Sequence, residues 1–383
     1  MDFPSLPLEP DLPPSLQPLL EGIRSGHRLS LARAISVVEN ERTGFQALLH
    51  ALLVSGGAGK GPAARVGITG PPGAGKSSLV TAMARTHMEA GETVGVVAVD
   101  PTSPYSGGAL LGDRIRMNEL ATDPRIFIRS MASRGSLGGL ATTTTEVLDV
   151  MDAAGFPRLL VETVGVGQTE LEIAGTADTV VVVLVPESGD GIQAMKAGLM
   201  EIADLFVVNK SDRPGADRLV REIRTALHYR AADVGRTSVP AHHGVDLARV
   251  GRGESRGNGA GEGDTTKPGK GPEGEGKGSG ATGRPEPWTP RVLQTVAHAG
   301  EGVDELLLAI EEHRTWMEAS GELERRRLAR TATRIRDVLD REMKRRVRRL
   351  LADPEVMGAS LDAIAAGGST PYAEAARLLE ELT

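Results

Sequence analysis

A glycine-rich stretch near residue 70 has the residues and the spacing of a phosphate-binding loop. It reads GPPGAGKS over Gly70–Ser77, which fits the pattern G-x-x-x-x-G-K-[ST] in full, between a strand-like apolar run and a helical pattern. Glycines there let backbone N–H groups turn toward phosphates, and the next helix adds its positive N-terminus. We predict that Lys76 reaches the β- and γ-phosphates and that the Ser77 hydroxyl binds Mg²⁺. The predicted phosphate contacts are Gly70, Pro71, Pro72, Gly73, Ala74, Gly75, Lys76, Ser77 and Ser78.

A second motif indicates which base the site accepts. The sequence VVNKSD, Val207–Asp212, ends another strand-like run and contains N-K-x-D as Asn209, Lys210 and Asp212. A carboxylate at this position can accept hydrogen bonds from the guanine N1–H and the exocyclic amine, which adenine cannot supply. Turns are rich in Asn and Asp, so the tetrapeptide alone is weak evidence. Downstream of a complete phosphate loop, and on its own strand end, it predicts GTP.

Three acidic residues end strand-like runs or lie in loops close to such ends. Asp100 closes VVAVD, Asp113 lies in LLGDRIRM, and Glu162 lies in LLVETVGVGQTE. An acid at the carboxyl end of a buried strand can hold Mg²⁺ directly or through water, or can orient the attacking water. Any one of them could instead cap a helix or pair with an arginine such as Arg114 or Arg116. Three acids around one phosphate loop favour a metal site.

The elements that must position these residues alternate along the chain between strand-like and helical runs. The strand-like runs are continuously apolar, which is typical of strands buried on both faces of a parallel sheet. The fold we predict is therefore α/β, with a doubly wound and mostly parallel sheet. The predicted strands read RVGIT, TVGVVAVD, RIFIRS, RLLVETV, DTVVVVLVP, DLFVVNK and RVLQTVA.

Segments outside this pattern divide the chain into three predicted regions. From Ser15 to about Val54 apolar residues fall at helical spacing, which indicates an N-terminal helical arm followed by a glycine-rich linker. Between Gly251 and Arg284, 13 of 34 residues are glycine and apolar residues are nearly absent, so we expect a disordered surface insertion. The regions are an arm over 1–60, a P-loop domain over 61–310 with the insertion at 251–284, and a helical region over 311–383.

The C-terminal sequence is long, helical and basic. Residues 325–349 hold twelve Arg or Lys against three acids, together with an apolar stripe at helical spacing. In one interpretation the stripe packs into the core beneath a solvated basic face. In the other, this arm pairs with another subunit or with a partner protein. Nucleic-acid binding ranks third because no aromatic residues or reader motif accompany the charge. The stripe is Leu328, Ala332, Ile335, Leu339 and Met343.

Composition narrows the compartment and the partners. The 51 acidic and 44 basic side chains give a net charge of -7, which argues against a protein that mainly coats nucleic acid or an anionic membrane. With no cysteine, the chain can form neither disulfides nor thiolate metal sites, which suits a reducing cytosol. Its first residues lack the features of a secretory signal, and no apolar run approaches the ~20 residues that span a bilayer. We expect a soluble, cytoplasmic protein.

Together the motifs resemble those of one family. The set GPPGAGKSS, VVAVDPTSP, LLGDRIRM, VETVGVGQTE, NKSD and SGELERRR is similar to that of the MeaB or ArgK family of P-loop GTPases. Members of this family chaperone adenosylcobalamin-dependent methylmalonyl-CoA mutase. The resemblance implies that GTP hydrolysis is coupled to cofactor delivery, to ejection of inactivated cobalamin and to protection of the mutase. It also implies a homodimer formed through the C-terminal helices.

The resemblance implies roles for single residues as well. The segment Pro186–Gly198 would be a mobile switch loop in which Lys196 senses the nucleotide. In TVAHAGEG the backbone of Val296, Ala297 and His298 would contact the guanine oxygen. Around the Mg²⁺ and the γ-phosphate, the implied catalytic residues are Lys76, Asp113 and Glu162, and the implied metal ligands are Ser77, Asp100 and Glu162.

The residues that follow Glu162 predict slow intrinsic hydrolysis. In Ras-like switches a glutamine directly follows the D-x-x-G glycine and orients water. Here the motif reads E-T-V-G, Val166 comes next, and Gln168 is offset. We therefore expect a partner to complete the site, since groups supplied in trans can add ~10³ to ~10⁵ in rate. The mutase is the partner that the resemblance implies.

Other functions fit parts of the sequence. A GTPase that inserts nickel or zinc would need soft or imidazole ligands, but cysteine is absent and His242 and His243 are the sole adjacent pair among eight histidines. A small-molecule phosphotransferase would need a substrate pocket and a base near the γ-phosphate. A scaffolding dimer that binds GTP without useful turnover is a third alternative. Isobutyryl-CoA and ethylmalonyl-CoA mutases are alternative partners.

Overall fold

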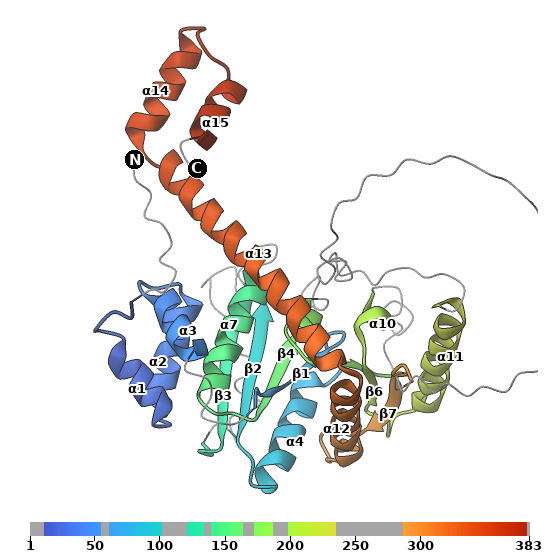
Figure 1. The fold of residues 1–383 in the computed structure, drawn as a ribbon. Coiled ribbons are helices and arrows are strands. Elements are labelled where there is room, and N and C mark those ends of the chain that lie inside the picture. Colours follow the sequence, from blue (N-terminus) through green and yellow to red (C-terminus); the bar gives the residue numbers. More distant parts are fainter. Residues whose placement is uncertain are drawn as a thin grey trace, which may run out of the picture.

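Seven parallel strands form the centre of the molecule (Figure 1). The computed structural model describes residues 11–54, 61–101, 120, 122–133, 139–163, 172–186, 198–234 and 286–380. The strand order is β3-β2-β4-β1-β5-β6-β7, with β1 near the middle, and every named pair is parallel. The bounds are β1 Ala64–Thr69, β2 Val94–Pro101, β3 Ile126–Ser133, β4 Arg158–Thr163, β5 Thr179–Leu184, β6 Leu205–Asn209 and β7 Arg291–Thr295.

Helices cover both faces of this sheet, so the predicted doubly wound α/β fold is confirmed. On one face α4 (Lys76–Glu89) and α12 (Val303–Ser320) pack on alternate residues of β1, β2, β5 and β6. On the other face α7 (Gly139–Ala153) covers β2, β3 and β4, and α11 (Ala216–Val234) covers β5 and β6. The short elements η1 (Ile173–Gly175) and α10 (Leu199–Ile202) complete that layer. Burial on both faces explains why the strands are continuously apolar.

Three N-terminal helices form a bundle that packs on α7 through α2 and α3. The helical periodicity predicted the helices but not where they pack. They are α1 (Gln17–Arg24), α2 (Arg28–Glu39) and α3 (Phe45–Val54), and their apolar side chains join those of α7 in one core. Polar contacts fix this bundle to the sheet edge. The guanidinium of Arg28 donates to the carbonyl oxygen of Pro124 at 2.7 Å and to that of Ile126 at 2.5 Å.

A long C-terminal arm leaves the domain and ends in a helical hairpin (Figure 1). Helix α13 (Glu322–Leu351) crosses the domain and carries α14 (Pro354–Ala365) and α15 (Pro371–Glu380) away from the sheet. The chain turns sharply between α12 and α13 at Gly321, whose φ of 73° suits glycine. A small cluster of Leu350 and Leu378 holds the hairpin to the end of α13.

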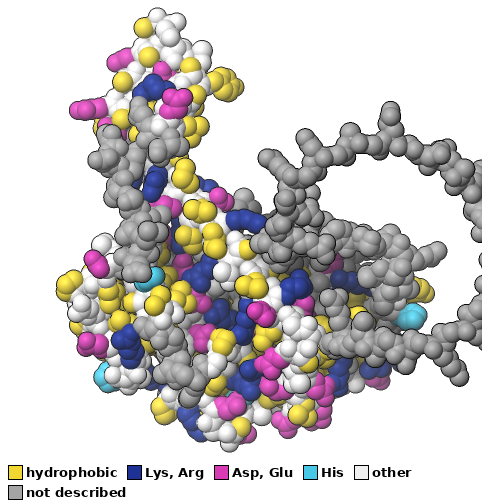
Figure 2. Space-filling model, viewed as in Figure 1, with side chains coloured by type: hydrophobic (Ala, Val, Ile, Leu, Met, Phe, Trp, Pro, Cys, Tyr) yellow, Lys and Arg dark blue, Asp and Glu magenta, His cyan; other side chains and the backbone are white. Residues whose placement is uncertain are grey.

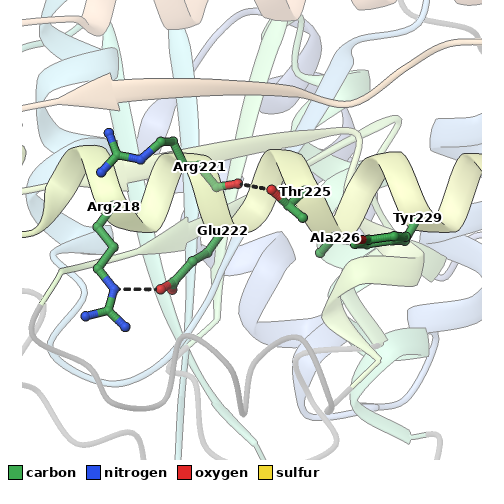
Figure 3. A pocket seen from close by; sticks show the side chains of 6 residues that line it. All are labelled: Arg218, Arg221, Glu222, Thr225, Ala226 and Tyr229. Atoms are coloured by element: carbon green, nitrogen blue, oxygen red, sulfur yellow. Dashed lines mark hydrogen bonds and ion pairs between the residues drawn. The ribbon is translucent and has the colours of Figure 1, made fainter.

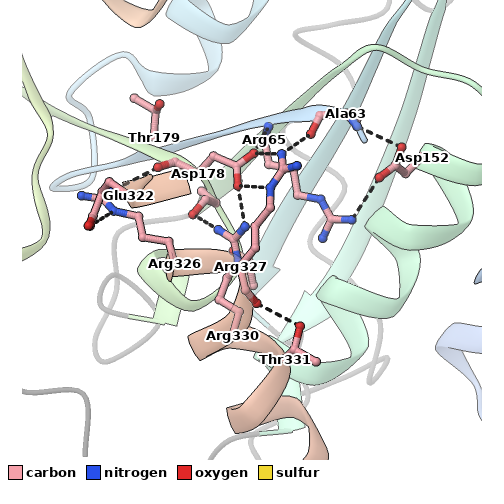
Figure 4. A network of polar contacts seen from close by, with 12 residues as sticks. Ala63, Arg65, Asp152, Asp178, Thr179, Glu322, Arg326, Arg327, Arg330 and Thr331 are labelled. Atoms are coloured by element: carbon pink, nitrogen blue, oxygen red, sulfur yellow. Dashed lines mark hydrogen bonds and ion pairs between the residues drawn. The ribbon is translucent and has the colours of Figure 1, made fainter. Parts of the chain in front are cut away.

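The inner face of α13 is basic rather than apolar. Its arginines pair with acidic side chains of the domain that are themselves buried, and Figure 4 shows the contacts around Asp178. Because sequence neighbours give no sign of these partners, the arginines look like a solvated face when the sequence is read alone. The pairs are Arg326–Asp204, Arg327–Asp178, Arg330–Asp178, Arg334–Asp149 and Arg341–Glu146.

The apolar stripe of α13 consequently faces away from the domain. Hydrophobic side chains are visible on the arm in Figure 2, and the side chain of Leu328 is 58% exposed. The interpretation in which this stripe packs into the core under a solvated basic face is therefore wrong. The other exposed members are Ile335, Leu339 and Met343, while Ala332 is half-buried.

Within the described residues, no helix is both long and apolar enough to cross a membrane. The glycine-rich segment Gly251–Arg284 lies outside the described residues, as do the linker residues 55–60.

Candidate functional site

The phosphate loop joins the central strand to a helix, as its motif requires. Strand β1 ends at Thr69, the loop follows, and α4 begins at Lys76. Two glycines are needed because of what lies beside them. A Cβ on Gly70 would sit 2.1 Å from the carbonyl oxygen of Val183 in β5, and Gly75, with φ of 86°, would place a Cβ 2.3 Å from Asn209 Nδ2. The loop therefore packs directly against the two strands on that side of β1.

The Lys76 side chain lies inside this loop. Its ammonium group donates to the carbonyl oxygens of Gly70 at 2.8 Å and Pro71 at 3.0 Å, and the residue is buried. A compact cation held within a loop of backbone amides can bind phosphate oxygens. Pro71 and Ala74 are buried with it, while Pro72, Gly73 and Ser78 are exposed.

The Ser77 hydroxyl and the Glu162 carboxylate meet beside the loop. Ser77 Oγ, in the first turn of α4, donates to Glu162 Oε1 at 2.6 Å, and both residues are buried. Register places the carboxylate there, because Glu162 in β4 pairs with Ile68 in β1, two residues before Gly70. A hydroxyl and a carboxylate oxygen are the kinds of ligand that Mg²⁺ prefers.

Asn209, at the end of β6, links two loops of the predicted nucleotide site. Its Nδ2 donates to the carbonyl oxygen of Ala74 at 2.9 Å, which joins it to the phosphate loop. Its Oδ1 accepts from Ala297 N and from Thr295 Oγ1, both at 3.1 Å. Thr295 was not among the predicted site residues. It directly precedes the predicted residue Val296, and its side chain joins the site only through the pairing of β6 with β7.

The other base-recognition residues lie around Asn209. Lys210 adopts a left-handed φ of 55°, and its ammonium group donates to the carbonyl oxygen of Gly73 at 3.0 Å. Asp212 is exposed two residues further on. The backbone of Val296 accepts from Ala299 N at 2.9 Å in a turn, with Val296 and Ala297 buried and His298 exposed. The structure thus brings the phosphate loop, N-K-x-D and the TVAH segment to one edge of the sheet.

Some predicted site residues lie outside the described part of the chain. Asp113, Gln168 and Lys196 are among the residues whose structure is not described. Asp100 pairs with Ala132 at the carboxyl end of β2, in agreement with its predicted place on a strand end, but its side chain is likewise outside the description. Their roles therefore stay predictions.

A shallow hollow on α11 is separate from these residues (Figure 3). None of its lining side chains belongs to the predicted nucleotide site, and two of them, Arg218 and Glu222, pair with each other at 2.8 Å. The lining residues are Arg218, Arg221, Glu222, Thr225, Ala226 and Tyr229.

Known proteins are similar to this chain in sequence and in fold. The sequence profile of the family described as "Methylmalonyl Co-A mutase-associated GTPase MeaB" matches residues 31–351. A Pyrococcus horikoshii protein named as a GTPase is 38% identical over 369 residues, covering 95% of this chain and 97% of that protein. The mouse "methylmalonic aciduria type A homolog, mitochondrial" is 34% identical over 319 residues, covering 81% of this chain and 65% of that protein.

A solved structure is similar over nearly the whole chain. The crystal structure of an LAO/AO transport system kinase superposes with a TM-score of 0.58 at 26% identity, and the match covers 96% of this chain and 97% of that one. The long family match, the relatives named as GTPases and the assembled phosphate loop agree with one another. The chain is therefore a P-loop GTPase that belongs to the MeaB family.

Proposed function

We propose that this chain is a GTP-driven chaperone of an adenosylcobalamin-dependent acyl-CoA mutase, with methylmalonyl-CoA mutase as the first candidate. It would couple GTP hydrolysis to loading of the cofactor and to protection of the mutase. The observation that carries the proposal is the match of residues 31–351 to a family described as methylmalonyl-CoA mutase-associated. The name of the mouse relative, which refers to methylmalonic aciduria, supports it.

We propose Ser77, Glu162 and Asp100 as the residues that hold Mg²⁺. The hydroxyl–carboxylate contact of 2.6 Å between Ser77 and Glu162 supports this set, because it brings together two hard oxygen donors beside the phosphate loop. When bound, the ion would neutralise charge that develops on the β- and γ-phosphates. Lys76 would bind the same phosphates from within the loop. Asp113 is proposed to act with Lys76 and Glu162 in catalysis.

Guanine recognition would fall to Asp212, while Asn209 and Lys210 hold the surrounding loops. The contacts of Asn209 with Ala74 and Ala297 support a link between the loop at the phosphate end of the nucleotide and the loop at its base end. Through such a link, binding of the base would help to position the phosphate loop. Val296, Ala297 and His298 would contact the guanine oxygen through their backbone.

Turnover would be slow until a partner binds, and the nucleotide state would be sensed by Lys196. The offset of Gln168 from the E-T-V-G glycine supports slow intrinsic hydrolysis.

A homodimer formed by α13 is part of the proposal as well. The outward apolar stripe supports it, because a row of large exposed apolar side chains favours burial against another surface. A cytoplasmic location and the absence of nucleic-acid binding remain predictions from composition.

A phosphotransferase is the second candidate, since the solved neighbour is named as a transport system kinase. Metal insertion is less favoured. The chain has no cysteine, and His242 and His243 are the sole adjacent pair among its eight histidines.

The proposed function is tested by following the activity of a purified acyl-CoA mutase over time with this chain and GTP, and with a Lys76→Ala variant. We expect wild-type protein with GTP to slow inactivation and to promote uptake of adenosylcobalamin, and the variant to do neither. Equal inactivation with and without the wild-type chain, across methylmalonyl-, isobutyryl- and ethylmalonyl-CoA mutases, would overturn the chaperone role.

A further inference from the structure

Two buried hydroxyl groups meet at the ends of β1 and β4. Thr163 Oγ1 donates to Thr69 Oγ1 at 2.9 Å, and the two residues are 4% and 0% exposed. Most of their neighbours along these strands are apolar, including Ile68 and Val161. A valine could fill either position with almost the same shape. Packing alone therefore does not explain why two hydroxyl groups are buried at these positions.

The hydroxyl bond lies where the two strands part. The last β1–β4 residue pair is Ile68 with Glu162. One residue later, Thr69 pairs with Val182 of β5, and Thr163 pairs with Val99 of β2. The Thr163–Thr69 bond thus continues the connection between β1 and β4 through side chains at the first position beyond their backbone pairing.

Each threonine adjoins a residue of the nucleotide site. Thr69 directly precedes Gly70, the first residue of the phosphate loop, and Thr163 directly follows Glu162. Successive strand residues point to opposite faces, so the carboxylate reaches Ser77 on the α4 side while the threonine hydroxyls lie on the other. The end of β4 is therefore attached to the phosphate-loop assembly on both faces: by Glu162 to Ser77, and by Thr163 to Thr69.

We infer that Thr163 is a positioning residue for the metal-binding carboxylate, acting through its hydrogen bond to Thr69. The bond fixes the end of β4 against the strand that carries the phosphate loop, and so holds the Glu162 carboxylate beside the Ser77 hydroxyl. The inference rests on the proposed Mg²⁺ role of Glu162 and Ser77. It assigns no contact with nucleotide or metal to either threonine.

If the end of β4 is held less firmly, Mg²⁺ should bind more weakly. The carboxylate would have to be ordered when Mg²⁺ binds, so Thr163→Val should raise the Mg²⁺ concentration that half-saturates GTP hydrolysis. Loss of one neutral hydrogen bond predicts a rise of about threefold to tenfold. Affinity for a fluorescent GDP analogue without Mg²⁺ should change less than about twofold, because the threonines touch neither phosphate nor base.

The experiment uses the 383-residue chain and compares wild type with Thr163→Val, Thr163→Ser, Thr69→Val and the double valine variant. Thr163→Ser should restore the wild-type Mg²⁺ dependence. The double variant should be no worse than either single one, because both remove the same bond. Thr144→Val on α7 is the matched control. It is also a buried threonine, and its hydroxyl makes no hydrogen bond within the described structure.

Hydrogen exchange of the nucleotide-free protein gives a readout that needs no activity. Peptides that cover β4 and the phosphate loop should exchange about threefold faster in Thr163→Val than in wild type, while Thr144→Val leaves them unchanged. A lower melting temperature with unaltered Mg²⁺ dependence and unaltered exchange at these peptides would overturn the inference. That result would show that the Thr163–Thr69 hydrogen bond stabilises the sheet but does not position Glu162.

A different set of results would show that the proposed Mg²⁺ site itself is wrong. If wild-type GTP hydrolysis did not depend on Mg²⁺, or if Glu162→Gln left that dependence unchanged, the metal role of Glu162 would be wrong and this inference would fall with it. A Mg²⁺-dependent wild type, a Glu162→Gln variant that needs more Mg²⁺, and an unaffected Thr163→Val would overturn the positioning role only.

Discussion

Asp178, just before β5, and Arg327, in α13, form an ion pair with two contact points. Arg327 Nη2 donates to Asp178 Oδ2 at 2.8 Å, and Arg327 Nε donates to Asp178 Oδ1 at 3.2 Å. The same carboxylate accepts from the backbone N–H of Arg65 at the start of β1, at 3.2 Å (Figure 4). One buried carboxylate therefore holds the C-terminal arm to the base of the strand that ends in the phosphate loop.

Asp178 should make the free energy of unfolding fall at acidic pH. Burial alone would raise its pKa, but hydrogen bonds and charge from Arg327 and Arg330 outweigh burial and lower the pKa to about 2. Since the folded-state pKa lies below the ordinary value of 3.8, the stabilisation is present above pH 3.8 and is lost as pH falls toward 2. The loss should amount to about 2 kcal/mol of unfolding free energy.

The check is denaturant unfolding as a function of pH with wild type and Asp178→Asn. At pH 7 the variant should be less stable by about 3 kcal/mol, because the half-buried arginines Arg327 and Arg330 would be left without their carboxylate partner. The difference should shrink below pH 3.8. Asp340→Asn, an exposed position on α13, serves as control. Parallel curves for wild type and Asp178→Asn down to pH 2 would contradict this role of Asp178.

The outward stripe of α13 should mediate self-association. Replacing Ile335 and Leu339 by glutamate puts charge on two side chains that are 58% and 55% exposed, so the monomer should fold normally. The dimer dissociation constant should rise by about tenfold or more, since burial of such side chains contributes about 1.5–3 kcal/mol each. Sedimentation measures the change. Leu308→Glu on α12, at a similarly exposed position, should have no effect. An unchanged dimer in the double variant would exclude this surface.

Asp212→Asn should change the base preference. The amide would present a donor where the guanine amine needs an acceptor, so GTP affinity should fall by about tenfold or more. Xanthosine triphosphate, which carries an oxygen at that position, should bind better than it does to wild type. Competition with a labelled nucleotide measures both. Equal GTP affinity in the two proteins would remove Asp212 from base recognition.

Deleting Gly251–Arg284 should leave the domain intact. A segment with 13 glycines in 34 residues offers little apolar surface for packing. The melting temperature and GTP affinity should stay close to those of wild type. A melting temperature that drops by several degrees in thermal denaturation would show that the segment packs on the domain.

Local patterns predicted the sheet, and they predicted that the phosphate loop and N-K-x-D lie at strand ends, because both depend on short stretches of sequence. Continuous apolar runs such as the one in β5 give strands buried on both faces, and G-x-x-x-x-G-K-[ST] contains its own loop geometry. Contacts between distant residues were not predictable in this way. The partner of Arg327 is 149 positions away, and the Thr163–Thr69 bond depends on the register of β4 against β1. The sequence alone also left open whether the apolar stripe of α13 is buried or exposed, because that depends on the distant acidic partners of the arginines in α13.

GTP hydrolysis by the purified protein, with ATP as control and with and without a cobalamin-dependent acyl-CoA mutase, tests the proposed function most directly. We predict slow, GTP-selective turnover that rises severalfold when the mutase is added, because the partner completes the site. Turnover that is the same with and without methylmalonyl-, isobutyryl- and ethylmalonyl-CoA mutases, or that prefers ATP, would contradict a mutase-coupled GTPase and favour the phosphotransferase alternative.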